Sequence, residues 1–190
     1  RGGIQFFPIA KLWLGSSKRI SVHDTAYMPA LGSEKNFSTE CGASLLNTFH
    51  FPQHEELPMV AQPPKSFIEH FEYVFGEDVE TAYDFFAHIV QKPEERPSWV
   101  PLSIASAHGT GRGWIDLMML KVLGHWNCSA TKIGPLVEAS NGGFSNFYDD
   151  KLWCNIPEIK VRSGTRYEVD DKLRDVLTDK NMLINPKYGR

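Results

Sequence analysis

The sequence predicts an α/β fold, because an apolar run, a glycine-rich turn and a helical pattern follow one another without interruption. Residues 99–104 are mostly apolar, with strand-forming types, as expected for a core strand. Residues 106–113 contain three glycines, and residues 114–123 repeat apolar side chains at the spacing of one buried helical face. A later run, residues 151–158, has the composition of a buried parallel strand. This order predicts a P-loop core with a mostly parallel sheet.

The glycine-rich turn is a candidate phosphate-binding loop. In such a loop successive backbone N–H groups point into one concavity, and the helix that follows adds its unpaired N–H groups and the positive end of its dipole. The usual pattern, G-x-x-x-x-G-K-[ST], corresponds here to Ser106-Ala-His-Gly-Thr-Gly111-Arg112-Gly113. Serine, arginine and glycine thus replace the first glycine, the lysine and the hydroxyl residue. The alternative is an ordinary glycine turn between a core strand and a core helix.

The composition is that of an ordered globular protein, with 190 residues, 42% hydrophobic and 12% aromatic. The net charge of -3 excludes a surface that is basic overall, so nucleic acid could bind only through a local patch. Cys41, Cys128 and Cys154 fit no zinc spacing, and we expect reduced thiols in an intracellular protein. No run of about 20 apolar residues occurs, so no membrane partner is expected.

Three regions are expected along the chain: an N-terminal region that is hard to interpret, a helical lead-in, and the core. Their limits are residues 1–62, 63–97 and 98–190. In the first region, residues 11–14 and 19–22 have the composition of short strands.

The lead-in has two helical patterns. Ser66 and Glu69 fit a capping box at the start of the first, which ends at Gly76. The second covers residues 79–91, and a polar linker, KPEERP, follows it. This linker leads the chain into the predicted core strand.

Two further sites are predicted beyond the glycine turn. Glu158 ends an apolar run, and an acid at the carboxyl end of a parallel strand lies where ligands bind in open sheets. There it could hold Mg²⁺ through water or orient an attacking water molecule. Lys187 and Tyr188 lie near the basic end of the chain, where a lysine beside an aromatic ring suits phosphate contact and base stacking. The alternatives are a surface glutamate and a solvated tail. A helix is expected over residues 169–177.

Several stretches together resemble the superfamily 3 helicases, in the branch found in primase-helicase proteins of phages and large DNA viruses. They occur in the family's order and at about its spacing. These segments are LLNTF (45–49), YDFFAHIVQKPEERP (83–97), HGTGRGW (108–114), FSNFYDDKLWCNIPE (144–158) and LTDKNMLINPKYGR (177–190). The combination of helix, QKP linker, strand and GTG turn is more specific than the glycine turn alone. The resemblance covers the second half of the chain well and the first 40 residues poorly.

This resemblance implies a RecA/AAA+-like ATPase core that assembles into a ring, usually a hexamer. Such rings use ATP and Mg²⁺, and they translocate on single-stranded or forked DNA at a replication fork. It also implies a phage or viral protein in the cytoplasm of the host cell. The chain ends at Arg190, before the family's sensor asparagine and arginine finger would appear, so an incomplete motor is expected.

The resemblance also implies roles for particular residues. The nucleotide-binding residues would be His108, Gly109, Thr110, Gly111, Arg112, Gly113 and Trp114. Glu158 matches the catalytic glutamate beside the metal, and Pro157 falls where the family has an aspartate. Lys187 and Tyr188 lie in the segment that leads into the DNA-binding hairpin.

Three functions are compatible with these observations. The first is an ATP-dependent DNA helicase, or a fragment of one. The second is a degraded ATPase fold that does not hydrolyse ATP and serves in ring assembly or single-strand DNA binding, because Gly113 removes one Mg²⁺ ligand and Pro157 removes the support of another. The third is a nucleotide kinase or another phosphotransferase with the same loop, for which the sequence offers no recognisable acceptor site.

Overall fold

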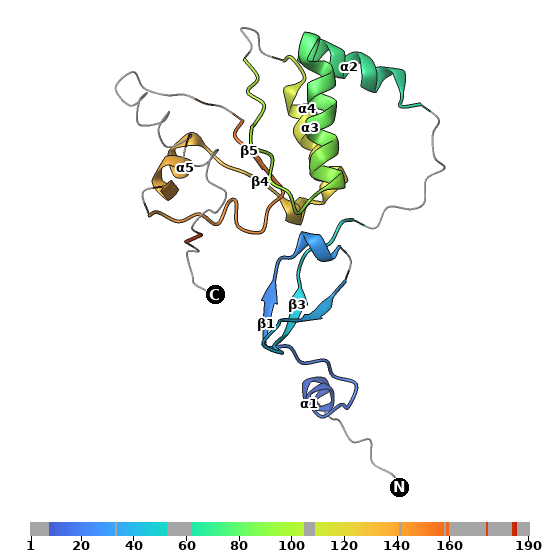
Figure 1. The fold of residues 1–190 in the computed structure, drawn as a ribbon, viewed down its shortest axis with the longest axis vertical. Coiled ribbons are helices and arrows are strands. Elements are labelled where there is room, and N and C mark those ends of the chain that lie inside the picture. The colour runs from blue at the N-terminus through green and yellow to red at the C-terminus, as the bar shows by residue number, and fades with distance from the viewer. Residues whose placement is uncertain are drawn as a thin grey trace.

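The computed structural model describes residues 8–32, 34–52, 62–104, 109–140, 142–157, 159, 174 and 184–185. These residues form a mixed α/β fold with short strands, which confirms the α/β part of the predicted class (Figure 1). The described strands form a mixed three-stranded sheet and a parallel two-stranded sheet, and the P-loop core remains a prediction. The helices are α1 (Ile9–Leu14), α2 (Lys65–Phe75), α3 (Val79–Gln91), α4 (Arg112–Leu123) and α5 (Ile133–Ser140), with short 3₁₀ turns η1 (Pro29–Leu31), η2 (Gly76–Asp78) and η3 (His125–Asn127). The strands are β1 (Asp24–Ala26), β2 (Asn36–Ser38), β3 (Ser44–Asn47), β4 (Cys128–Ala130) and β5 (Trp153–Asn155).

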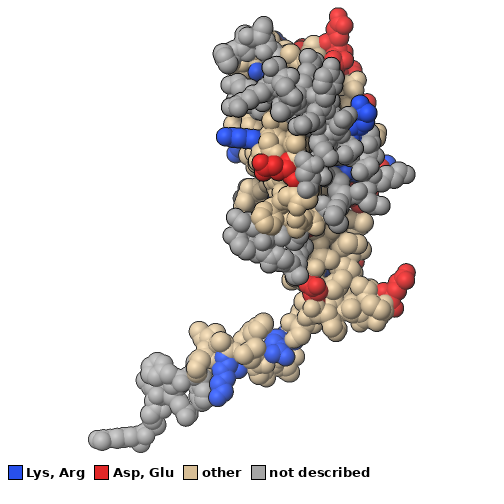
Figure 2. Space-filling model, turned by 90° about the vertical axis from the view of Figure 1, so that its left-hand side faces the viewer, with Lys and Arg blue, Asp and Glu red and all other residues tan. Residues whose placement is uncertain are grey.

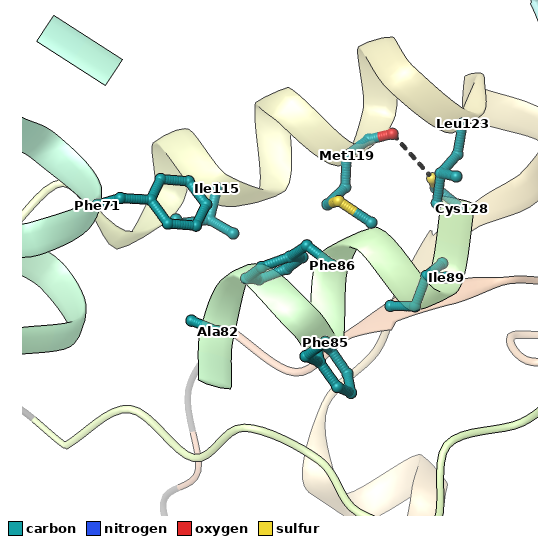
Figure 3. Close-up of a cluster of buried hydrophobic side chains, with 9 residues drawn as sticks. All are labelled: Phe71, Ala82, Phe85, Phe86, Ile89, Ile115, Met119, Leu123 and Cys128. Carbon is teal, nitrogen blue, oxygen red and sulfur yellow. Dashed lines mark hydrogen bonds between the residues drawn. The ribbon is translucent and has the colours of Figure 1, made fainter. Parts of the chain in front are cut away.

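The main core lies between α2, α3 and α4. Helix α4 turns Ile115, Met119 and Leu123 toward α3, as Figure 3 shows. The buried members of this core are Phe71, Ala82, Phe85, Phe86, Ile89, Ile115, Met119, Leu123 and Cys128. Residues three and four positions apart share one face of a helix, so the apolar spacing in the sequence leads directly to this packing.

The C-terminal ends of these helices agree with the sequence prediction, but α2 and α4 begin earlier than predicted, α4 at Arg112 and not at Trp114. Helix α3 has the predicted bounds, and α2 ends at Gly76, which adopts a φ of 55° that favours glycine. The predicted capping box is wrong, because α2 begins at Lys65 and its N-cap is Pro64 with no side-chain cap bond. The side chain of Glu69 lies 3.1 Å from that of Lys65 in an exposed ion pair. The helix therefore begins two residues earlier than it would with Ser66 as its N-cap.

The N-terminal region differs from its predicted strands. Residues 9–14 form α1 and residues 19–22 form no strand. Residues 12–14 form an apolar run of only three residues, and the periodicity of so short a run does not distinguish a strand from a helix. The sheet of this region is β1-β3-β2, with β1 parallel and β2 antiparallel to β3. Helix α1 buries no residue, and this end of the chain extends from the body as an arm (Figure 2).

A buried asparagine joins the N-terminal sheet to the end of α4. The Tyr27 hydroxyl donates to Asn127 Oδ1 at 2.8 Å, and Asn127 Nδ2 donates to the carbonyls of His50 at 2.8 Å and Leu123 at 2.7 Å. Burial raises the pKa of Tyr27, so its phenol keeps the proton that it donates. Asn127 therefore fixes two parts of the chain by three hydrogen bonds.

Replacement of this asparagine is expected to destabilise the protein strongly. Asn127→Ala removes one hydrogen-bond partner from the Tyr27 hydroxyl and from the carbonyls of Leu123 and His50, and should lower the free energy of unfolding by about 2–4 kcal/mol. The His50 carbonyl keeps the Trp126 indole as a donor. Urea denaturation followed by circular dichroism measures the loss. The exposed Asn36 of β2 provides the control, and Asn36→Ala should change stability by less than about 0.5 kcal/mol. Equal stability of the two variants would show that the asparagine does not join the two parts.

Within the run 151–158, the structure confirms a parallel strand only over Trp153–Asn155, where Cys128 lies opposite Trp153 in the β4–β5 pair. The strand predicted over residues 99–104 is wrong: the structure assigns no strand there. Its apolar side chains are exposed, from 43% at Trp99 to 88% at Ile104. Pro101 lies within the run and lacks the N–H that a ladder needs. Apolar composition alone therefore did not predict a paired strand.

Two helical segments toward the C-terminus, α5 and residues 169–177, differ in how they relate to the sequence prediction. Helix α5 was not predicted, and it contains Gly134 and Pro135, two residues that disfavour a helix interior. Both fall in its first turn, where the N–H groups have no partner within the helix, so they are tolerated there. The helix predicted over residues 169–177 lies outside the described residues apart from Arg174, which is helical.

Candidate functional site

The glycine turn and the start of α4 form the candidate site. The helix begins at Arg112, and its N-cap, Gly111, adopts a φ of 80°. Gly109 adopts a φ of 75°. Both values lie in the left-handed region that glycine enters without steric cost. The turn therefore leads directly into a helix end where the first amides, those of residues 112 and 113 among them, have no partner within the helix.

The side chain of Arg112 folds back over this turn. Its Nε donates to Thr110 Oγ1 at 3.0 Å, and its terminal nitrogen donates to the Ser103 carbonyl at 3.3 Å. The residue is exposed, so the guanidinium remains accessible from solvent. A positive charge thus lies beside the positive end of the α4 dipole.

A cavity of about 220 Å³ lies beside the turn. It is lined by Tyr73, Val74, Ser103, Ile104, Thr110 and Arg112. Its polar groups are a guanidinium and three hydroxyls, and none of the lining residues is acidic. This chemistry suits an anion.

The glycines leave the backbone open on one side only. A Cβ placed at Gly109 or at Gly113 would have no atom of the described residues within 4 Å, so a ligand could approach the backbone there. A Cβ at Gly111 would lie 2.2 Å from Cε1 of His70, so that side of the turn is filled. The described residues therefore fit a phosphate group in contact with the open side of the loop.

The same residues offer little to a magnesium ion. Gly113 has no hydroxyl where the usual pattern has one, and the hydroxyl of Thr110 already accepts from Arg112. The acid nearest in sequence on α4 is Asp116, and its Oδ1 accepts a 2.8 Å hydrogen bond from the Trp153 indole. Among the described residues, no group of three or more His, Cys, Asp or Glu side chains is placed to hold a metal.

Trp114, one of the predicted nucleotide-binding residues, attaches α4 to α2. Its ring meets those of Phe67, His70 and Phe71 edge-on, with centroids 5.5, 4.9 and 6.1 Å away. Its position in the first turn of α4 means that this packing fixes the helix end that carries the glycine turn.

The structure also brings His70 of α2 to the site. Its Nε2 lies 3.2 Å from the Gly111 carbonyl. The two residues are 41 positions apart, so no local pattern in the sequence indicates the contact.

The remaining predicted residues lie outside the described part of the chain. These are His108, Glu158, Lys187 and Tyr188. The catalytic and metal role of Glu158 and the DNA contacts of Lys187 and Tyr188 remain predictions. No helix among the described residues is long and apolar enough to span a bilayer.

Comparison with known proteins relates the chain to solved structures. No protein-family model matches it, and neither does any curated protein. An apo structure of the C-terminal region of NrS-1 aligns with a TM-score of 0.69 and 20% identity, over 86% of this chain and 38% of that one. An A-form apo structure of the same region gives a TM-score of 0.66 and 19% identity, over 94% and 42%. The chain thus spans about two fifths of these structures, and it shares the fold of that part of the NrS-1 C-terminal region.

Proposed function

We propose that the glycine turn before α4 binds the phosphates of ATP, and that the chain is an ATP-dependent DNA helicase of the replicative primase-helicase type, or a fragment of one. The observation that carries the proposal is the cavity at the start of α4, which Thr110 and Arg112 line. The helicase-like segments of the sequence support it. The fold shared with the NrS-1 C-terminal region is consistent with it.

The proposed binding mode follows from the geometry of the turn. The first amides of α4 and its dipole would stabilise phosphate oxygens. Arg112 would exchange its bonds to Thr110 and Ser103 for a two-pronged contact with phosphate, which guanidinium geometry favours. Mg²⁺, when bound with ATP, would neutralise phosphate charge, and Glu158 would position it through water or orient the attacking water molecule.

The proposed DNA contact is local. Acidic and basic side chains are interspersed on the face in Figure 2, and no described part of that face is broadly basic. Lys187 and Tyr188 would therefore supply the contact with single-stranded or forked DNA by ion pairing and stacking. A homohexameric ring would place one copy of this contact per subunit around a central channel.

One set of observations favours the alternative, a fold that binds ligand without hydrolysis. None of the described residues that line the cavity is acidic, Gly113 lacks the hydroxyl, and Pro157 stands where the resemblance expects an acid. Such a chain would act in ring assembly or single-strand DNA binding. Measurement of Mg²⁺-dependent ATP turnover by a longer form of the chain, extended beyond Arg190, separates the two proposals, because clear turnover removes the alternative.

The nucleotide site is tested by Arg112→Ala. Removal of the guanidinium should weaken binding of a fluorescent, non-hydrolysable ATP analogue about tenfold or more, because a charge-assisted contact to phosphate is lost. Fluorescence titration at one fixed salt concentration measures the change. Lys121→Ala is the matched control, since this exposed cation lies in the last turn of the same helix. Equal affinity of the wild type and Arg112→Ala would remove the loop assignment.

A further inference from the structure

A histidine of α2, His70, forms a hydrogen bond with the glycine turn. His70 lies in the middle of α2, and its Nε2 lies 3.2 Å from the Gly111 carbonyl. Because a carbonyl can only accept, His70 must donate this hydrogen bond through Nε2–H. The imidazole occupies the space that a side chain at position 111 would need.

The Gly111 carbonyl has two donors, and together they fix its direction. The second is the Trp114 amide, at 2.9 Å, in the first turn of α4. A trans peptide unit is planar, so its N–H points opposite to its C=O. Fixing the Gly111 carbonyl therefore also fixes the Arg112 N–H, which must point away from His70 and out of the helix end.

The position of His70 is itself fixed by packing. Its ring meets Trp114 edge-on at 4.9 Å, and Trp114 packs against Phe67 and Phe71 on the same face of α2. Phe71 is 1% exposed, so this aromatic group belongs to the protein core. The donor is thus attached to a rigid element and not to a loop.

We propose that His70 is a positioning residue for phosphate binding, which orients the Gly111–Arg112 peptide so that the Arg112 amide faces the anion. This inference rests on the proposed nucleotide site. It extends that site to α2, a helix outside the phosphate-loop pattern. A displacement of α2 would turn the amide away and weaken the site without any change in the loop sequence.

Three substitutions at position 70 separate hydrogen bonding from packing. His70→Ala removes both the donor and the ring, and His70→Phe keeps a ring beside Trp114 but has no donor. His70→Gln places an amide N–H close to the position of the imidazole Nε2–H. We expect the ATP analogue to bind about tenfold more weakly to the Ala and Phe variants, and within about threefold of wild type to the Gln variant.

A second histidine provides a matched control. His88 of α3 makes the same type of bond, from Nε2 to the Glu95 carbonyl at 3.2 Å, away from the glycine turn. His88→Ala should leave affinity unchanged. Thermal unfolding of every variant identifies any that has lost its fold, and the Phe and Gln pair decides the question if the Ala variant does not fold.

The outcomes distinguish the positioning role of His70 from the nucleotide site on which that role rests. Weak binding by His70→Phe with recovery in His70→Gln supports the positioning role. Wild-type affinity in His70→Phe, or no recovery in His70→Gln, overturns that role while the Arg112→Ala result leaves the nucleotide site in place. Absence of analogue binding by the wild-type chain itself overturns both.

Discussion

Phe71→Ala should lower the free energy of unfolding by about 3–5 kcal/mol, the largest stability effect that we expect of one substitution. The Phe71 side chain is 1% exposed and belongs to the cluster between α2, α3 and α4. It stacks on Tyr83 with ring centroids 5.0 Å apart and meets Phe86 edge-on at 5.8 Å. Truncation to alanine leaves a cavity that the surrounding rings, held by their own contacts, can fill only in part.

The measurement is urea denaturation, with an aromatic control on the same helix. Tyr73 lies two residues away in α2 and is 69% exposed, so Tyr73→Ala should cost less than about 1 kcal/mol. Phe71→Leu should fall between the two because it retains part of the buried volume. A loss below about 1.5 kcal/mol for Phe71→Ala would mean that this ring is not central to the core.

The helical part of this core could be predicted from the sequence because its signal is local. Apolar residues at positions i, i+3 and i+4 fix which face of a helix is buried, and Gly76 and Gly124 mark the ends of α2 and α4. The bounds of α3 follow from the same pattern. Parallel pairing of β5 was predictable because a short apolar run after a helix is typical of a buried parallel strand.

The two wrongly predicted strands have one physical origin, which is that strand pairing is a tertiary property. The apolar run at 99–104 has a suitable composition, but no ladder with a neighbouring strand forms there. Residues 12–14, three apolar residues in a row, suggested a strand, but they lie in helix α1. Pro101 is a local signal against the first strand, but otherwise strand preference reflects the environment in which a segment packs.

At the candidate site, too, local backbone features follow from the sequence and contacts between distant segments do not. Of the three glycines in the predicted turn, Gly109 and Gly111 have positive φ values, whereas Gly113 lies in α4. The support from His70 depends on how α2 packs against α4, so no spacing in the sequence could reveal it. Glu158, Lys187 and Tyr188 lie outside the described residues, and their roles remain predictions from the sequence alone.

The largest expected effect on binding is that of Gly111→Ala. An alanine at a φ of 80° costs roughly 1–2 kcal/mol in backbone strain. Its methyl group would also lie 2.2 Å from the imidazole of His70, so the ring must leave and its bond to the Gly111 carbonyl must break. Strain and loss of the support act together, and we expect ATP-analogue affinity to fall by about a hundredfold or more.

The neighbouring glycine separates strain from collision. Gly109 has a φ of 75°, but an added Cβ would have no atom within 4 Å, so Gly109→Ala carries the strain without the clash. Its affinity should therefore fall much less than that of Gly111→Ala. In the double variant His70→Ala with Gly111→Ala, the collision is gone, and the second substitution should cost less than it does in the wild-type background. Strictly additive losses in this cycle, or equal losses at the two glycines, would show that the imidazole does not limit what position 111 can hold.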